Sequence, residues 1–176
     1  YIGDFAFNAT KLEMNQLVIP EGVEEINQYA FAFCRKLKAQ VILPSTIKKI
    51  GEWAFYGCPI TSINLPEGLE SLGSLAFWDC DLREVSIPSS CHEFNEGWQF
   101  GFNRNLEKMH LPEGMTEIPD HFAVDCFRLR EVNFPHTLKH IGEKAFSLCI
   151  SLKNVELPLG MQSLGEEAFS ELEALE

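Results

Sequence analysis

Apolar residues recur along the chain in a short motif of two apolar residues at alternate positions, the second of which is followed directly by a proline. In the second copy of the motif the apolar residues are Val41 and Leu43, and Pro44 follows them. Successive prolines are separated by 24, 22, 22, 24, 23 and 23 residues, and they are Pro20, Pro44, Pro66, Pro88, Pro112, Pro135 and Pro158. A nearly fixed period in this range predicts a solenoid, whose stacked coils bury one continuous core.

The alternating positions predict one short strand in each coil. A run of period 2 that is rich in branched residues is typical of a strand with one buried face. Stacked coils would place these strands side by side in one parallel sheet, about 4.8 Å apart. The inward pairs are Leu17/Ile19, Val41/Leu43, Ile63/Leu65, Val85/Ile87, Met109/Leu111, Val132/Phe134 and Val155/Leu157.

Beyond each proline the spacing of apolar positions changes. The inward residues of the second coil become Ile50, Ala54, Phe55 and Cys58. This i, i+4, i+5, i+8 pattern predicts a short helical segment opposite the sheet. The position directly after Ile50, seven residues after the proline, forms a column when the coils are aligned. This column holds glycine or asparagine in six of seven coils, which predicts a positive φ there. Pro119 cannot adopt that φ, and the usual Ala-Phe order is reversed at Phe122-Ala123, so we expect that coil to follow a different path.

The columns together predict an α/β solenoid. We expect about seven coils of 22–24 residues, with one parallel sheet and short helical segments on the opposite side. With 176 residues, 45% of them hydrophobic, the chain can form a single domain over residues 1–176. Residues 1–7 match the middle of the repeat, so we expect the chain to be a piece of a longer array.

Charge excludes two classes of partner. The chain carries 26 acidic and 14 basic residues and a formal net charge of -12. Nucleic-acid binding needs a clustered Lys/Arg surface, and anionic membranes attract basic rather than acidic proteins. No stretch approaches the roughly 18 apolar residues needed to span a bilayer. We therefore expect neither nucleic-acid binding nor membrane insertion.

The full repeat is clearest over residues 129–149, LREVNFPHTLKHIGEKAFSLC. This phrase resembles the BspA-like leucine-rich repeat family, whose pattern runs approximately Leu-x-x-Ile-x-Ile-Pro-x-x-Val-x-x-Ile-Gly-x-x-Ala-Phe-x-x-Cys. The resemblance implies a secreted or cell-surface protein that acts in adhesion or binding, with a protein or other host extracellular ligand as its partner. It implies no catalytic residues.

Cysteines and histidines give no sign of chemistry. Five cysteines share the column fourteen residues after the proline: Cys34, Cys58, Cys80, Cys126 and Cys149. Phe102 and Leu172 stand in the same column, so we interpret it as a packing site for free, buried thiols, although disulfides between adjacent coils are sterically conceivable. The five histidines lack metal-ligand spacing, and no catalytic or phosphate-binding motif occurs. We expect no enzyme, no metal and no cofactor.

Two surfaces are candidates for a partner. On the outward side of the strands, Val18 and Ile42 are apolar; they extend the core, lie under a further coil, or form an adhesive patch. A mixed-charge field on the same side serves either solubility or a partner, and its basic members are Arg83, Lys108, His110 and Arg130.

The second surface is a pair of aromatic rows nine and twelve residues after the proline. Its main members are Trp53, Tyr56, Trp78 and Phe100, and the irregular segment that follows Asn95 adds Trp98. The rows either cover the helical layer or contact a ligand. We predict a non-catalytic recognition module of the adhesin type. The alternative is a spacer that projects another domain, for example a hydrolase. The sequence leaves the oligomeric state open.

Overall fold

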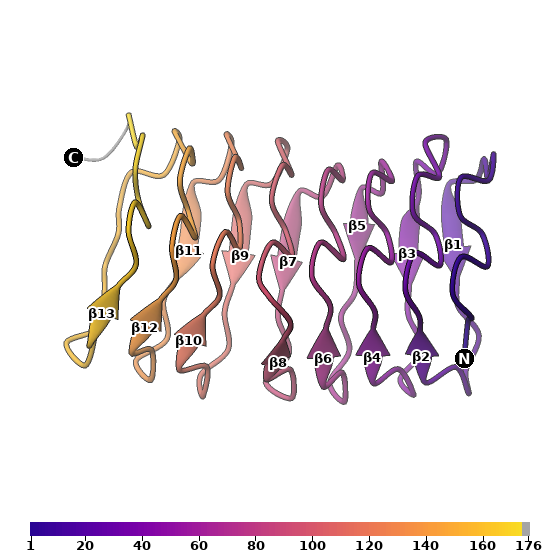
Figure 1. Cartoon of the computed structure of the whole chain (residues 1–176), viewed down its shortest axis with the longest axis horizontal. Coiled ribbons are helices and arrows are strands. Elements are labelled where there is room, and N and C mark those ends of the chain that lie inside the picture. The colour runs from indigo at the N-terminus through magenta and orange to yellow at the C-terminus, as the bar shows by residue number, and fades with distance from the viewer. Residues whose placement is uncertain (174–176) are drawn as a thin grey trace.

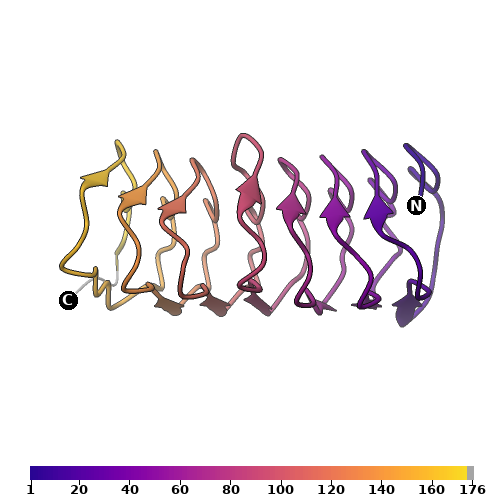
Figure 2. The same ribbon diagram turned by 90° about the horizontal axis from the view of Figure 1, so that it is seen from below.

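The computed structural model describes residues 1–173. The chain winds into coils that stand side by side in a row (Figure 1). Two sets of short strands lie on opposite sides of this row (Figure 2). One hydrophobic cluster, running from Ile19 in the first coil to Ala168 near the end of the described chain, fills the space between them. The predicted solenoid and its continuous core are confirmed.

The first set contains the strands that the alternating pattern predicts. They pair in parallel, with equivalent residues opposite each other, as Leu17 and Val41 are. They are β1 (Gln16–Val18), β3 (Gln40–Ile42), β5 (Ser62–Ile63), β7 (Glu84–Ser86), β9 (Lys108–His110) and β11 (Glu131–Asn133). They form two three-stranded sheets, β1-β3-β5 and β7-β9-β11, so the expectation of one sheet is wrong. Residues 154–156 form no strand, and the stack has about six complete turns rather than seven.

The second set of strands was not predicted. Each is two residues long and ends at the apolar residue six after the proline, where the sequence suggested the start of a helical segment. They are β2 (Glu25–Ile26), β4 (Lys49–Ile50), β6 (Ser71–Leu72), β8 (Glu93–Phe94), β10 (Glu117–Ile118), β12 (His140–Ile141) and β13 (Ser163–Leu164). They form the sheets β2-β4-β6-β8 and β10-β12-β13. The break between β8 and β10 is visible in Figure 1.

Residues 1–173 contain no helix, so the predicted helical segments are wrong. In the second coil the amides of Trp53, Phe55 and Gly57 donate to carbonyl oxygens of the third coil at 2.8 to 2.9 Å. The intervening amides of Ala54 and Tyr56 donate to carbonyls three residues earlier, at 3.3 and 3.1 Å. The segment is therefore a series of β-turns that is also hydrogen-bonded to the next coil. Two successive turns point the same side chains inward as two turns of helix would.

Positive φ angles occur in different columns from the one expected. In most coils they fall nine and thirteen residues after the proline, as at Trp53 (57°) and Gly57 (64°), and they also occur two residues after it at Gly22, Gly68 and Gly114. The glycines in the predicted column serve another purpose. A Cβ on Gly73 would lie 2.4 Å from the amide nitrogen of Glu52 in the preceding coil. Glycine is needed there because the two backbones touch, not because the φ angle is unusual.

The coil with the reversed Phe122-Ala123 order follows the same path as its neighbours. The amide of Ala123 donates to the next coil at 2.8 Å, and His121 has the positive φ of its column. Within the turn segment that follows Pro119, only the packing changes. Phenylalanines stack along the preceding coils, and the Phe122 ring meets the last of them, Phe100, edge-on at 5.4 Å. The expected change of path is therefore wrong.

Candidate functional site

A ladder of side chains runs along the turn segments, one rung in each coil. The Tyr29 and Trp53 rings stack with centroids 5.2 Å apart and planes inclined by 16°. Further along, the Trp98 ring stacks on the His121 imidazole at 3.6 Å and 8°. Because these rings stack along the axis of the row, their faces cover each other and their edges face outward. Partial burial lowers the pKa of His121, which favours the neutral imidazole in the stack.

A second row lies beside this ladder. The Tyr56 ring is 4.3 Å from Trp53, and the Trp78 ring lies 4.6 Å from Phe102 and 5.3 Å from Trp98. Each of these side chains is half-buried. We call the two rows together the aromatic belt, which consists of Tyr29, Trp53, Tyr56, Trp78, Trp98 and Phe102. The structure thus brings Trp53 together with Tyr56, and Trp78 together with Trp98, in two groups of rings that lie on neighbouring coils.

Phe100 does not belong to this surface. Its side chain is fully buried and stacks on Phe77 at 5.5 Å, in the inner phenylalanine column. Its coil carries an extra residue between Asn95 and Trp98, which moves each later residue one column inward from the count. Gly101 occupies the place of Tyr56 and Trp78 instead, and the half-buried Phe102 follows it in the next column. The 24-residue spacing from Pro88 to Pro112 was the available signal.

Two arginines that the sequence reading missed flank the belt. The Arg35 guanidinium lies 5.6 Å from the Phe33 ring centroid and pairs with Asp79 at 3.0 Å. The Arg104 guanidinium lies 5.3 Å from Phe102, within the range of a cation–π contact. Each arginine follows an aromatic residue by two positions, a signal that is present in the sequence. Arg104 also pairs with Asp125 at 3.7 Å, so the rim of the belt carries two arginine–aspartate ion pairs.

The polar atoms of the belt are open to solvent. Within residues 1–173, the tyrosine hydroxyls and indole N–H groups of the belt have no hydrogen-bond partner, and none is among the buried atoms that lack one. A partner can therefore reach both the apolar ring edges and these donors.

The other candidate surface is the strand face, the side that carries β1, β3, β5, β7, β9 and β11. Val18 is 56% exposed and lies opposite the half-buried Ile42 across the β1–β3 pair. The pair of apolar residues that the sequence indicated is thus adjacent and accessible. The strands that carry these residues, β1 and β3, lie on the opposite side of the row from β2 and β4 (Figure 2).

The charge field lies at the other end of the strand face. Lys108 pairs with Glu131 at 2.9 Å, His110 with Glu84 at 3.1 Å, and Arg130 with Glu107. The Lys108 ammonium holds the pKa of the Glu131 carboxyl below its usual value. Arg83 is exposed beside this group, and no ion pair joins it to another described residue. Most of these charges are neutralised by a neighbouring coil.

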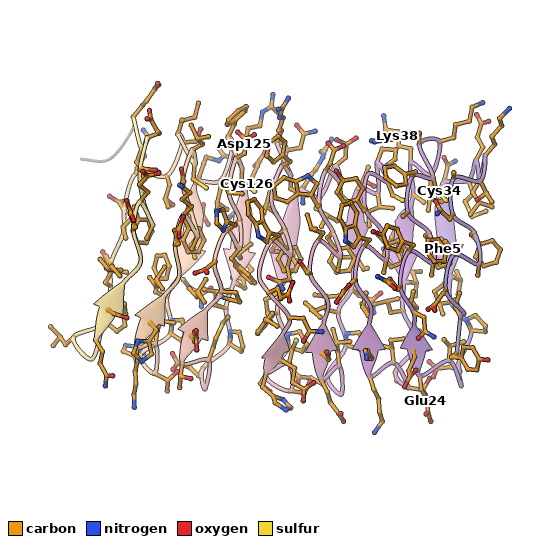
Figure 3. The ribbon with its side chains drawn as sticks, viewed as in Figure 1. Phe5, Glu24, Cys34, Lys38, Asp125 and Cys126 are labelled. Carbon is orange, nitrogen blue, oxygen red and sulfur yellow. The ribbon has the colours of Figure 1, made fainter. Side chains whose placement is uncertain are left out.

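All six cysteines are free and buried, as predicted. The thiols of the shared column donate to carbonyl oxygens of the preceding coil at 2.9 to 3.4 Å, as Cys58 does to Phe31. Figure 3 shows Cys34 and Cys126 near the same edge of the row. Burial raises the pKa of Cys91 and Cys149 to about 12, so both are neutral thiols at physiological pH.

In the fourth coil the place of the cysteine is taken by Asn103, not Phe102. The Asn103 amide donates to the Phe77 and Phe100 carbonyls at 2.7 and 2.9 Å, and its oxygen accepts from the Leu82 amide. In the fourth coil a hydrogen-bond donor, not a bulky apolar residue, occupies this place, so the packing argument from Phe102 was wrong although its conclusion about burial holds.

Within residues 1–173, no three His, Cys, Asp or Glu side chains gather in a metal-binding arrangement. The described part of the chain also contains no apolar helix of membrane-spanning length.

The chain matches the sequence model of the BspA type leucine rich repeat region in six copies, over residues 1–123, 39–149 and 120–176. None of the curated proteins is similar to it at a significant level. Among solved structures it is similar to a leucine-rich repeat protein from Bacteroides ovatus, with a TM-score of 0.86 and 34% identity. That match covers 93% of this chain and 42% of the other, so the chain spans less than half of that protein.

A leucine-rich repeat protein from T. pallidum is also similar, with a TM-score of 0.81 and 31% identity over 92% of this chain and 78% of that one. A leucine rich cell surface protein from Faecalibacterium prausnitzii shares the fold, with a TM-score of 0.55 and 23% identity over 93% of this chain and 53% of that one.

Proposed function

Because the chain belongs to the BspA-type leucine-rich repeat family, we propose that it is a non-catalytic protein-binding module of a cell-surface or secreted protein. The observation that carries this proposal is the aromatic belt with Arg35 and Arg104 at its rim. Tryptophan, tyrosine and arginine are the side chains most enriched at the energetic centres of protein interfaces.

The rigidity of the belt favours binding. Its rings are held by stacking and by turns that are hydrogen-bonded to the next coil, so a partner immobilises few additional rotamers. Preorganisation of this kind reduces the entropy cost of association. The belt spans several coils, as expected of a module in which a few side chains on successive coils supply most of the affinity.

The proposed setting is a cell surface, where the module acts in adhesion to a host extracellular protein. The Faecalibacterium prausnitzii protein of the same fold is a leucine rich cell surface protein, which supports the setting. The ligand-binding role distinguishes this proposal from that of a spacer, which needs the coils but not the belt.

The strand face is the second candidate binding surface, because Val18 is largely exposed beside Ile42. The charged residues Arg83, Lys108, His110 and Arg130 would extend that surface toward β11. Ion pairs to neighbouring coils make Lys108, His110 and Arg130 less available to a partner than the rings of the belt.

The test compares two double variants against a panel of purified extracellular-matrix proteins by biolayer interferometry. Trp53→Ser with Tyr56→Ser should weaken binding about 30-fold, corresponding to about 2 kcal/mol for the loss of two anchors. The matched control, Glu84→Ser with His110→Ser, removes an exposed pair from the strand face and should leave affinity unchanged. The opposite ranking would assign the binding site to the strand face, provided that both variants retain the circular dichroism of the parent protein.

A further inference from the structure

The sheet on the β2 side is interrupted between β8 and β10 (Figure 1). In other coils the residue after the second strand donates its amide to the preceding coil, as Gly51 does to Ile26 at 2.7 Å and Gly73 to Ile50 at 2.8 Å. Pro119 occupies this place after β10 and has no N–H to donate. The extra residue before Trp98 lengthens the chain at the same point, so the two strands remain apart.

The interruption leaves backbone groups without backbone partners. In the third coil the amides of Glu70 and Ser71 donate to the preceding coil at 2.8 and 3.2 Å. Within residues 1–173, the equivalent amides of Thr116 and Glu117 have no such partner, nor do the carbonyls of His92 and Phe94. One wall therefore offers acceptors and the other offers donors, which is the arrangement that an added strand uses.

A cleft of about 430 Å³ lies along these two edges. This volume is within the range of pockets that hold small ligands or short segments. The half-buried Phe94 and the buried Met115 supply its apolar lining, whereas Glu96, Glu117 and Asp120 are exposed around it. Among the lining residues His92 is the one basic side chain.

We propose that this cleft binds an extended segment of a partner protein that carries lysine or arginine. The segment's main chain bonds to the Thr116 and Glu117 amides and to the His92 and Phe94 carbonyls. Alternate side chains then meet the apolar lining and the acidic rim, because side chains on an extended strand alternate in direction. Charge complementarity selects basic side chains, in agreement with the net charge of -12. None of the lining residues belongs to the aromatic belt, although the cleft adjoins it at Trp98, whose amide donates to the Asp120 carbonyl at 3.1 Å.

The probe is a fluorescein-labelled peptide of alternating valine and lysine, measured by fluorescence polarisation at physiological salt. We expect saturable binding of this peptide. The same peptide with glutamate in place of lysine should bind at least about tenfold more weakly. N-methylation of the valine amides should weaken binding by a similar factor, because it removes main-chain donors. The variant Glu96→Lys with Glu117→Lys should lose affinity for the lysine peptide, whereas Trp53→Ser with Tyr56→Ser should retain it.

Hydrogen exchange locates the contact. The amides of Thr116 and Glu117 should exchange quickly in the protein alone and slow down when the lysine peptide is added. Absence of saturable binding would overturn the proposal. So would equal binding of the N-methylated peptide, because the attraction would then be electrostatic and would not involve the open edges. Unchanged exchange at these two amides would also overturn it.

Discussion

At the scale of single residues, the cysteine column shows what a pattern can and cannot reveal. Its repetition at a fixed distance from each proline predicts burial, and all its thiols are buried. The reason for the choice of residue is visible only in three dimensions, where each side chain donates to a carbonyl of the preceding coil. Asn103 fulfils the same role with a different side chain, and a count from the proline cannot find it because of the preceding insertion.

Replacement of Asn103 tests this account. Asn103→Ala leaves the Leu82 amide and the Phe77 carbonyl buried without this partner, and should lower the free energy of unfolding by about 2 to 3 kcal/mol. Asn103→Cys should cost less, because a thiol donates to the equivalent carbonyl in other coils. Urea unfolding measures both. Equal losses for the two variants would show that the column is selected by size alone.

At the scale of elements, the strands of the first set could be predicted because alternation has one simple structural meaning. The turn segments could not, because inward residues spaced i, i+4, i+5 fit two consecutive β-turns as well as two turns of helix. Hydrogen bonds decide between them, and here they alternate between the same coil and the next. The sequence pattern predicted a positive φ at the glycine column. The structure shows instead that glycine is required there because the backbones of adjacent coils touch.

Two glycines that differ only in their surroundings make this distinction measurable. Gly73→Ala would place a methyl group 2.4 Å from the Glu52 amide nitrogen and should lower the free energy of unfolding by about 3 kcal/mol. Gly160→Ala meets no atom within 4 Å and should change it by less than about 0.5 kcal/mol. Chemical denaturation of the two variants gives the comparison. Similar effects at both positions would mean that the coils can separate at no cost.

Pairs of coils are further joined at their proline turns. Glu21 accepts from the Ser45 amide and hydroxyl at 3.1 Å each, and the Gly22 amide donates to Thr46 at 3.0 Å. The same contacts join Glu67 to Ser89. These turns add fixed contacts between neighbouring coils beyond the sheets.

At the scale of the whole molecule, a regular stack carries two irregular surfaces. The aromatic columns were visible in the sequence, and four of the five aromatic residues predicted for this surface lie in the belt. Phe100 does not, because the insertion in its coil changes the column count. The break between β8 and β10 has sequence signals in Pro119 and the 24-residue repeat, but the cleft depends on hydrogen bonds that only the folded chain shows.

The most direct test of the central claim is hydroxyl-radical footprinting of the protein alone and when saturated with the matrix protein that it binds. Mass spectrometry then reports the oxidation of each aromatic side chain. The account predicts that oxidation of Trp53, Tyr56 and Trp78 falls on binding, while that of His110 on the strand face is unchanged. Protection of His110 with the belt still fully oxidised would contradict the claim that the belt is the binding surface.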